Sequence, residues 1–241
     1  MDLTTATARA RIERLDNPAW HALTTLHARF AEGDALAKRY PATMSQIGAV
    51  RESTAEAHRS MAKLLGPGGI ARLFMSEPGE PSPFFSVLEK FEVRQMIGPR
   101  QPPRDEEDDI QELTAADVPE MLRLIELTRP GPFGARTHEM GTYLGIRKAG
   151  RLVAMAGERL RLPGFTEISS VCTDPEHRGR GYARRLVSAL ARRIAQRDET
   201  AFLYVLLDND PALRIYEKLG FETRRCVRIA VIRANPPESA T

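Results

Sequence analysis

The chain has 241 residues, and 35 Lys or Arg against 32 Asp or Glu leave a formal net charge of only +3. That balance argues against nucleic-acid binding, which requires a clear excess of positive charge. Hydrophobic residues make up 42% of the chain and charged residues 28%, as in a soluble globular protein. Neither a membrane-length apolar run nor a secretion signal is visible, so we predict a cytoplasmic protein without a membrane partner.

Residues 1–98 are predicted to form a smaller α/β region ahead of the main domain. Ser53-Thr-Ala-Glu56 has the pattern of a capping box and predicts a helix that runs to about Leu65. The apolar runs 70–75 and 85–97 are expected to be strands.

The segment Gly98-Pro-Arg-Gln-Pro-Pro-Arg-Asp-Glu-Glu-Asp-Asp109 marks the clearest boundary. Three prolines and a run of acidic residues favour extended, solvated backbone over a packed core. We therefore predict a linker over residues 99–108, a second domain over 109–235 and a short tail over 236–241.

The second domain has the alternating pattern of a mixed α/β fold. Strands are expected at Ile110–Leu113, Tyr143–Arg147, Arg151–Arg161, Phe165–Thr173, Ala201–Leu207 and Glu222–Ile232. Helices are expected after the capping residues Thr114–Asp117, near Thr137–Met140, over Ala183–Arg197, and from Pro211 with Asp210 as the N-cap.

The most informative stretch joins the strand that ends at Thr173 to the long helix. A strand that turns through Gly179 and Gly181 into a helix leaves unpaired N–H groups at the helix start. The glycines remove the Cβ atoms that would keep a phosphate at a distance, and Arg178 and Arg180 add positive charge. This pattern predicts phosphate binding, although it is also compatible with an ordinary strand–turn–helix.

Arg178-x-x-Gly181-x-Ala183 resembles the Q/R-x-x-G-x-G/A motif of the GNAT (GCN5-related) N-acetyltransferases. Residues 203–221 resemble the closing segment of that superfamily, a strand followed by a short helix that ends in Tyr-x-x-x-Gly-Phe. The resemblance covers about residues 109–235. It implies a GNAT fold with a mixed central sheet and flanking helices, and an enzyme that transfers an acetyl group from acetyl-CoA to a primary amine.

The resemblance also implies how coenzyme A is held. Two neighbouring strands separate before the phosphate loop, so that backbone groups of the first strand pair with the pantetheine arm. An asparagine after the next strand also contacts the cofactor, although at this position it is equally typical of a turn. The expected cofactor-binding residues are Val171, Cys172, Thr173, Arg178, Gly179, Arg180, Gly181, Tyr182, Ala183, Arg184 and Asn209.

Two residues are expected to carry the chemistry. Glu167 lies eleven residues before Arg178, the separation at which histone-type members of the superfamily have their catalytic glutamate. We predict that Glu167 is the general base; it could instead face solvent or pair with an arginine. Tyr216 matches the tyrosine that protonates the coenzyme thiolate, although it could be a packing aromatic. Simple alternation places Glu167 and Val171 on one strand face and Cys172 on the other, unless a bulge intervenes.

The remaining reactive residue types predict no further chemistry. Cys172 and Cys226 lie in apolar runs and are expected to be reduced thiols, and Cys172 is expected to be a buried strand residue rather than an acetylated nucleophile. The five histidines lack metal-ligand spacing, so we predict no metal site. Tyr204 stands where N-terminal acetyltransferases often have a glutamate, which disfavours the ribosomal-protein type.

Several questions stay open at this level. The acceptor cannot be identified, and a homodimer is neither favoured nor excluded. Residues 1–98 are compatible with a degenerate GNAT-like half, which would shape the acceptor pocket or complete the core. Two alternative functions are an acyltransferase that uses another acyl-CoA or acceptor, and a non-catalytic acyl-CoA sensor.

Overall fold

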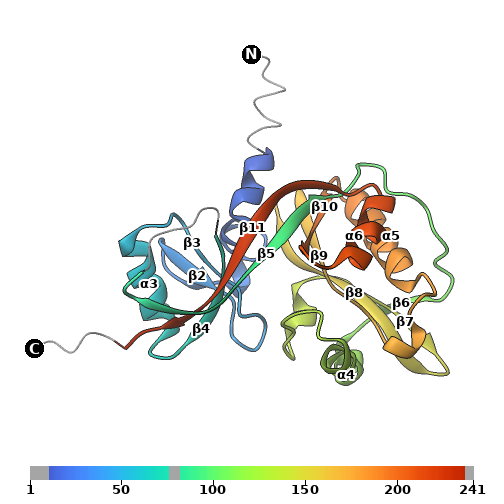
Figure 1. Cartoon of the computed structure of the whole chain (residues 1–241), viewed down its shortest axis with the longest axis horizontal. Helices are drawn as coiled ribbons and strands as arrows, with labels where there is room; N and C mark the ends of the chain where they lie inside the picture. The colour runs from blue at the N-terminus through green and yellow to red at the C-terminus, as the bar shows by residue number, and fades with distance from the viewer. Residues whose placement is uncertain (1–10, 76–81, 237–241) are drawn as a thin grey trace, which may run out of the picture. The chain divides into compact units, whose positions relative to one another are not determined.

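A computed structural model describes residues 11–75 and 82–236 (Figure 1). The chain divides into two compact units. Unit 1 takes residues 1–41, 46–93 and 227–241, and unit 2 takes residues 42–45 and 94–226. The expected linker, residues 99–108, therefore lies within unit 2, and the last strand passes from unit 2 into unit 1. Among the described residues no helix is long and apolar enough to span a membrane.

Unit 1 is a small α/β unit with an antiparallel three-stranded sheet in the order β1-β2-β3. Its elements are η1 (Arg14–Asp16), α2 (Pro18–Thr24), η2 (Ala28–Phe30), β1 (Glu32–Gly33), β2 (Ala37–Arg39), β3 (Gly48–Val50), α3 (Ala55–Leu65) and β4 (Ile70–Met75). The predicted helix and strand at residues 55–65 and 70–75 are confirmed. The cap of α3 differs from the expected capping box, because Thr54 accepts the hydrogen bond from the Ala57 N–H and the Ser53 hydroxyl contacts His58.

Unit 2 is built on a mixed sheet in the order β5-β10-β9-β8-β7-β6, with β11 beside β5. The strands of this sheet are β5 (Phe85–Ile97), β6 (Ile110–Leu113), β7 (Tyr143–Lys148), β8 (Arg151–Leu162), β9 (Phe165–Thr173), β10 (Thr200–Leu206) and β11 (Glu222–Ala234). Strands β5 and β11 belong only in part to unit 2, because residues 85–93 and 227–234 are assigned to unit 1. Strands β9 and β10 pair in parallel, whereas β6 to β9 pair antiparallel. This is the predicted mixed central sheet.

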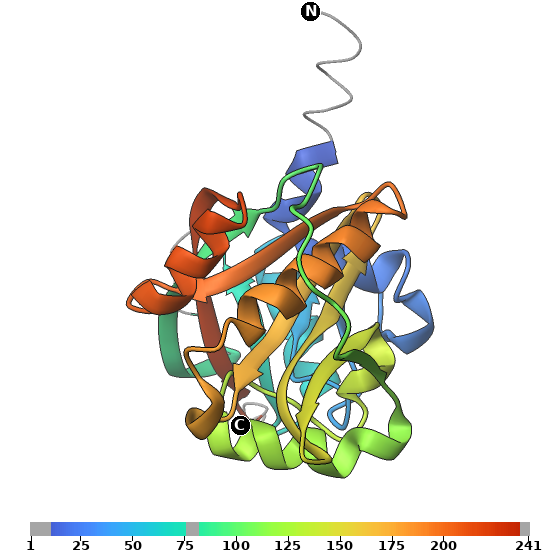
Figure 2. The same ribbon diagram turned by 90° about the vertical axis from the view of Figure 1, so that its right-hand side faces the viewer.

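Helices cover both faces of this sheet. They are η3 (Ala115–Asp117), α4 (Val118–Thr128), η4 (Thr137–Met140), η5 (Pro175–His177), α5 (Tyr182–Ala195) and α6 (Asp210–Lys218). Helix α5 lies over β8 and β9 (Figure 2) and buries one apolar stripe, formed by Leu186, Leu190 and Ile194. Helix α4 packs on the opposite face, where Met121 and Leu124 join a cluster that includes Cys172 and Tyr143.

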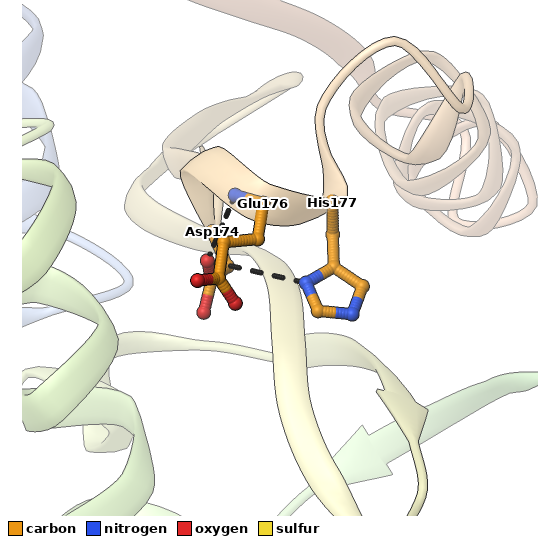
Figure 3. Close-up of side chains that lie close together, drawn as sticks. All are labelled: Asp174, Glu176 and His177. Atoms are coloured by element: carbon orange, nitrogen blue, oxygen red, sulfur yellow. Dashed lines mark hydrogen bonds and ion pairs between the residues drawn. The ribbon is translucent and has the colours of Figure 1, made fainter.

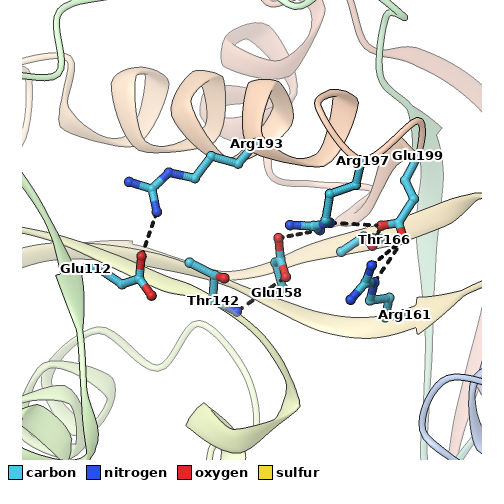
Figure 4. A network of polar contacts seen from close by, with 8 residues as sticks. All are labelled: Glu112, Thr142, Glu158, Arg161, Thr166, Arg193, Arg197 and Glu199. Carbon is cyan, nitrogen blue, oxygen red and sulfur yellow. Dashed lines mark hydrogen bonds and ion pairs between the residues drawn. The ribbon is translucent and has the colours of Figure 1, made fainter.

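Arginines of α5 and of the turn after it fix that helix on its sheet (Figure 4). Arg197 donates to buried Glu158 at 2.7 Å, and Arg193 donates to Glu112 of β6 at 2.8 Å. Glu199 accepts from Arg161 at 2.8 Å and from the Thr166 hydroxyl at 2.6 Å. These contacts hold the C-terminal end of α5 against the sheet.

Candidate active site

Strands β9 and β10 separate in the last part of β9. Their pairing runs from Phe165 and Thr200 to Ile168 and Leu203, whereas β9 continues to Thr173. On its other edge β9 remains paired with β8 up to Thr173. The β10-facing edge of residues 169–173 is therefore left without a strand partner within the described chain, which is the separation that the resemblance implies.

A bulge at Ser170 lies inside the separated part of β9. Ser170 has a φ of 55°, and the register with β8 slips by one residue between Ser169 and Cys172. A bulge reverses which face the following side chains take. Val171 therefore packs with Ile168 on the α5 side, and Cys172 packs on the α4 side. Simple alternation predicts the opposite faces for Val171 and Cys172, and the bulge named as its exception is present here.

Glu167 lies on the face away from α5, at the end of the paired part of β9. It is 1% exposed, and its two oxygens accept from Arg159 of β8, at 3.0 Å from Nε and 2.5 Å from Nη2. The sequence left open whether Glu167 is a general base, faces solvent or pairs with an arginine. In the structure it pairs with an arginine. The sequence analysis did not single out Arg159, because its place opposite Glu167 depends on a second register shift in β8.

Two tyrosines flank this pair on the same face, the buried Tyr143 and the half-buried Tyr204. Burial raises the pKa of Tyr143 and of Tyr204, so both are neutral phenols. The Tyr204 hydroxyl accepts from the Gln95 side chain at 2.9 Å. The Tyr143 ring crosses β8 at Gly157, where a Cβ would stand only 2.2 Å from it, and glycine is required at that crossing.

The phosphate loop has the geometry that the sequence predicts. Gly179 and Gly181 have φ angles of 75° and 76°, and a Cβ at either would meet nothing within 4 Å. Gly181 is the N-cap of α5, and no side chain caps that end. Arg178 and Arg180 are exposed. The first N–H groups of α5 therefore face an open, positively charged surface, as an anion site requires. Tyr182 is buried in the α5 core and Ala183 is half-buried.

The arginines further along α5 are held by the acidic segment 103–109. Arg184 binds the Asp105 carboxylate at 2.9 Å, and Arg185 binds Asp109. The Ser188 hydroxyl donates to the Pro103 carbonyl at 2.5 Å. The segment expected to be a solvated linker thus lies along α5. Arg184, expected to bind the cofactor, already has a carboxylate partner.

Asp174 anchors the start of the loop (Figure 3). Asp174, Glu176 and His177 bring possible metal-ligand atoms within 4.8 Å of one another, which the histidine spacing did not suggest. However, the Asp174 carboxylate accepts from Arg151 at 2.7 Å and from the Glu176 N–H at 3.1 Å, and Arg123 lies 4.0 Å away. Its pKa is lowered, chiefly by the hydrogen bond from Arg151. Two guanidinium groups oppose a cation here, and Asp174 caps η5 instead.

Helix α6 carries the last two predicted residues. Tyr216 is 7% exposed, its ring centroid lies 6.1 Å from that of Phe221, and burial raises its pKa to about 12. Asn209 is the N-cap of α6, since its side chain accepts from the Ala212 N–H at 3.2 Å. The sequence had placed this cap one residue later, at Asp210.

Cys172 has the properties of a packing residue. Burial raises its pKa to about 11, although hydrogen bonds with the Thr128 side chain and the Met155 backbone oppose the shift. A thiol with such a pKa contains almost no thiolate at neutral pH. An acetylated cysteine intermediate is therefore disfavoured.

Comparisons with known proteins agree with this geometry. A family model described as FR47-like protein matches residues 143–229. A solved structure from Novosphingobium aromaticivorans, described as an acetyltransferase of the GNAT family, is 34% identical, covers 92% of this chain and 98% of its own, and superposes with a TM-score of 0.85.

Curated relatives match over a shorter span. The N-alpha-acetyltransferase RimI of Mycobacterium tuberculosis is 38% identical in an alignment of 100 residues, which covers 39% of this chain and 62% of that protein. A mycothiol acetyltransferase of Mycobacterium marinum is 41% identical in an alignment of 120 residues, which covers 46% of this chain and 38% of that protein. The match thus spans less than two thirds of either relative. The full-length match to the solved structure, together with the separated strands and the glycine loop, establishes that the chain belongs to the GNAT acetyltransferase superfamily.

Proposed function

We propose that unit 2 is an acetyl-CoA-dependent N-acetyltransferase that transfers the acetyl group directly to a primary amine. The observation that carries this proposal is the separation of β9 from β10 beyond Ile168, which leads into a glycine loop at an uncapped helix start. Together these features supply unpaired backbone groups for an extended arm and a cluster of N–H groups for its phosphates.

The residues of the loop fit a diphosphate. Backbone N–H groups from Gly179 to Arg184 would hold its oxygens, and the exposed guanidinium groups of Arg178 and Arg180 would add charge-assisted hydrogen bonds. Residues 171–173 would hold the pantetheine arm through their unpaired edge. Asn209 and Arg184 are weaker candidates for cofactor contacts, because each already has a structural partner.

The chain's own groups supply the proton transfers. The bound thioester provides an activated acetyl group whose carbon–sulfur bond breaks as the carbon–nitrogen bond forms. Glu167 takes the proton of the amine, through a water molecule because the carboxylate is buried. Tyr216 holds a proton at neutral pH, since its pKa is raised to about 12, and gives it to the departing sulfur.

The acceptor is proposed only as an amine. The matched relatives have different names, an N-alpha-acetyltransferase in one case and a mycothiol acetyltransferase in the other, so their names do not select one acceptor for this chain. Localisation in the cytoplasm also remains a prediction.

Release of free thiol from acetyl-CoA, measured with a panel of amines, tests this function. Glu167→Gln should lower turnover and alter its pH dependence while coenzyme A affinity, measured by calorimetry, stays nearly unchanged. Tight binding without thiol release for any amine would favour the non-catalytic acyl-CoA sensor, and competition with longer acyl-CoA species would detect a different acyl preference.

A further inference from the structure

The pair formed by Arg159 and Glu167 is unusual for a stabilising contact, because both side chains are largely removed from water. The Arg159 side chain is 15% exposed and that of Glu167 is 1% exposed. Burial alone would lower the pKa of Arg159, but attraction and hydrogen bonding to Glu167 outweigh burial and raise it. A buried ion pair contributes little net stability compared with apolar packing. The pair lies where β9 begins to separate from β10, and this position therefore suggests a functional role.

The geometry of the contact fixes the carboxylate in one orientation. Nε and Nη2 of Arg159 each approach a different oxygen, at 3.0 and 2.5 Å. Such a two-point contact holds the plane of the carboxylate close to the plane of the forked guanidinium group. One lone pair on each oxygen remains outside this fork and can accept another proton.

The two tyrosines that interact electrostatically with Glu167 are neutral. Tyr143 lies on β7 and Tyr204 on β10, and burial raises the pKa of both. Glu158 also acts electrostatically on Tyr143, and Arg225 on Tyr204. In the described part of the chain, Arg159 is thus the cation that contacts Glu167.

We propose that Arg159 is a positioning residue, which keeps Glu167 ionised and aimed so that the carboxylate can accept the amine proton. This inference rests on the proposed function. A buried carboxylate that loses its cationic partner takes up a proton much more readily, by as much as about 3–5 pH units in fully buried sites. A protonated carboxyl group cannot act as a base, so loss of Arg159 should make activity depend on raised pH.

The test compares Arg159→Met, Arg159→Gln and Arg159→Lys. The methionine and glutamine variants both remove the positive charge. The glutamine retains a hydrogen-bond donor in case the methionine variant does not fold. The lysine retains the charge but not the two-point contact. Arg161→Met is the matched control, because it removes another arginine from β8 that pairs with a glutamate, Glu199. Each variant is assayed for kcat from about pH 6 to 9, the range in which an unpaired buried carboxylate can titrate. In parallel, NMR follows glutamates labelled at the δ-carbon, and Glu167→Gln assigns the resonance.

We expect the charge-removing variants to lose at least about tenfold in kcat at pH 7 and to recover as pH rises, with the Glu167 resonance moving from its protonated to its ionised position over the same pH range. Arg159→Lys should keep the wild-type pH dependence at a lower kcat, because it retains the charge but not the fork. Arg161→Met should keep both the pH dependence and the kcat of the wild type. The proposal is overturned if the charge-removing variants lose activity equally at every pH, or if their Glu167 resonance stays at its ionised position at pH 6. Absence of thiol release by the wild-type protein would reject the proposed function, whereas the NMR titration would still decide the role of Arg159.

Discussion

Gly181 offers the sharpest test of the phosphate loop. It has a φ of 76°, and a Cβ added there would meet no atom within 4 Å, so Gly181→Ala causes backbone strain without a clash. A non-glycine residue in this conformation costs about 1–2 kcal/mol. In a protein of this size that corresponds to a fall in Tm of about 2–8 °C.

Gly150 provides a matched control for that strain. It has a φ of 79° in the turn between β7 and β8, and a Cβ there would also meet nothing within 4 Å. Gly150→Ala should therefore lower Tm by a similar amount. It should leave coenzyme A affinity unchanged, because it lies outside the loop.

The two variants should differ in cofactor binding. A methyl group at position 181 projects toward the surface where the phosphates would lie and displaces them from the N–H groups. Loss of one charge-assisted hydrogen bond costs about 1.5–3 kcal/mol, which weakens binding about tenfold to a hundredfold. Calorimetric titration with coenzyme A measures this difference directly. If Gly181→Ala binds as tightly as Gly150→Ala, the loop does not hold the phosphates and the reasoning fails.

Three further predictions concern single side chains. Arg180→Met should weaken coenzyme A binding more than Arg184→Met in calorimetry, because Asp105 already holds Arg184, and the reverse order would contradict this assignment. Tyr216→Phe should lower kcat about a hundredfold or more with little change in cofactor affinity. Because the pKa of Tyr216 is raised to about 12, Tyr216 retains its proton between pH 7 and 9. The acid role would be contradicted if the wild-type rate fell over this range and the Tyr216→Phe rate did not. Iodoacetamide at neutral pH should modify exposed Cys226 and spare Cys172, whose pKa is raised to about 11; mass spectrometry of the native protein checks this.

The sequence predicted helices and strands well where local signals are strong. Strand 165–173 has its predicted bounds because a β-branched run ends at a proline and glycine turn. Strands 85–97 and 110–113 also begin and end as predicted. The short helix at 137–140 was likewise located correctly. In each case neighbouring residues alone determine the structure.

Features that depend on distant residues escaped prediction. The pairing of Arg159 with Glu167 follows from register shifts in β8 and β9, which periodicity cannot reveal. The acidic segment 103–109 resembles a linker in composition, but the arginines of α5 neutralise it and hold it in place. The path of β11 into unit 1 is a property of the whole fold, and its sequence indicates only a strand.

The bulge at Ser170 divides β9 into a part that pairs with β10 and a part that does not. Before the bulge, Glu167 lies opposite Phe202 in the paired part of the two strands. After it, the strand has no partner on the β10 side and continues to Thr173, where the turn toward the phosphate loop begins. Six residues of strand between Glu167 and Thr173 span about 20 Å. A donor that is anchored by phosphates at the loop and reacts near Glu167 must therefore carry its acyl group at the end of a long, narrow arm, which is the shape of an acyl-CoA and excludes a short acyl phosphate.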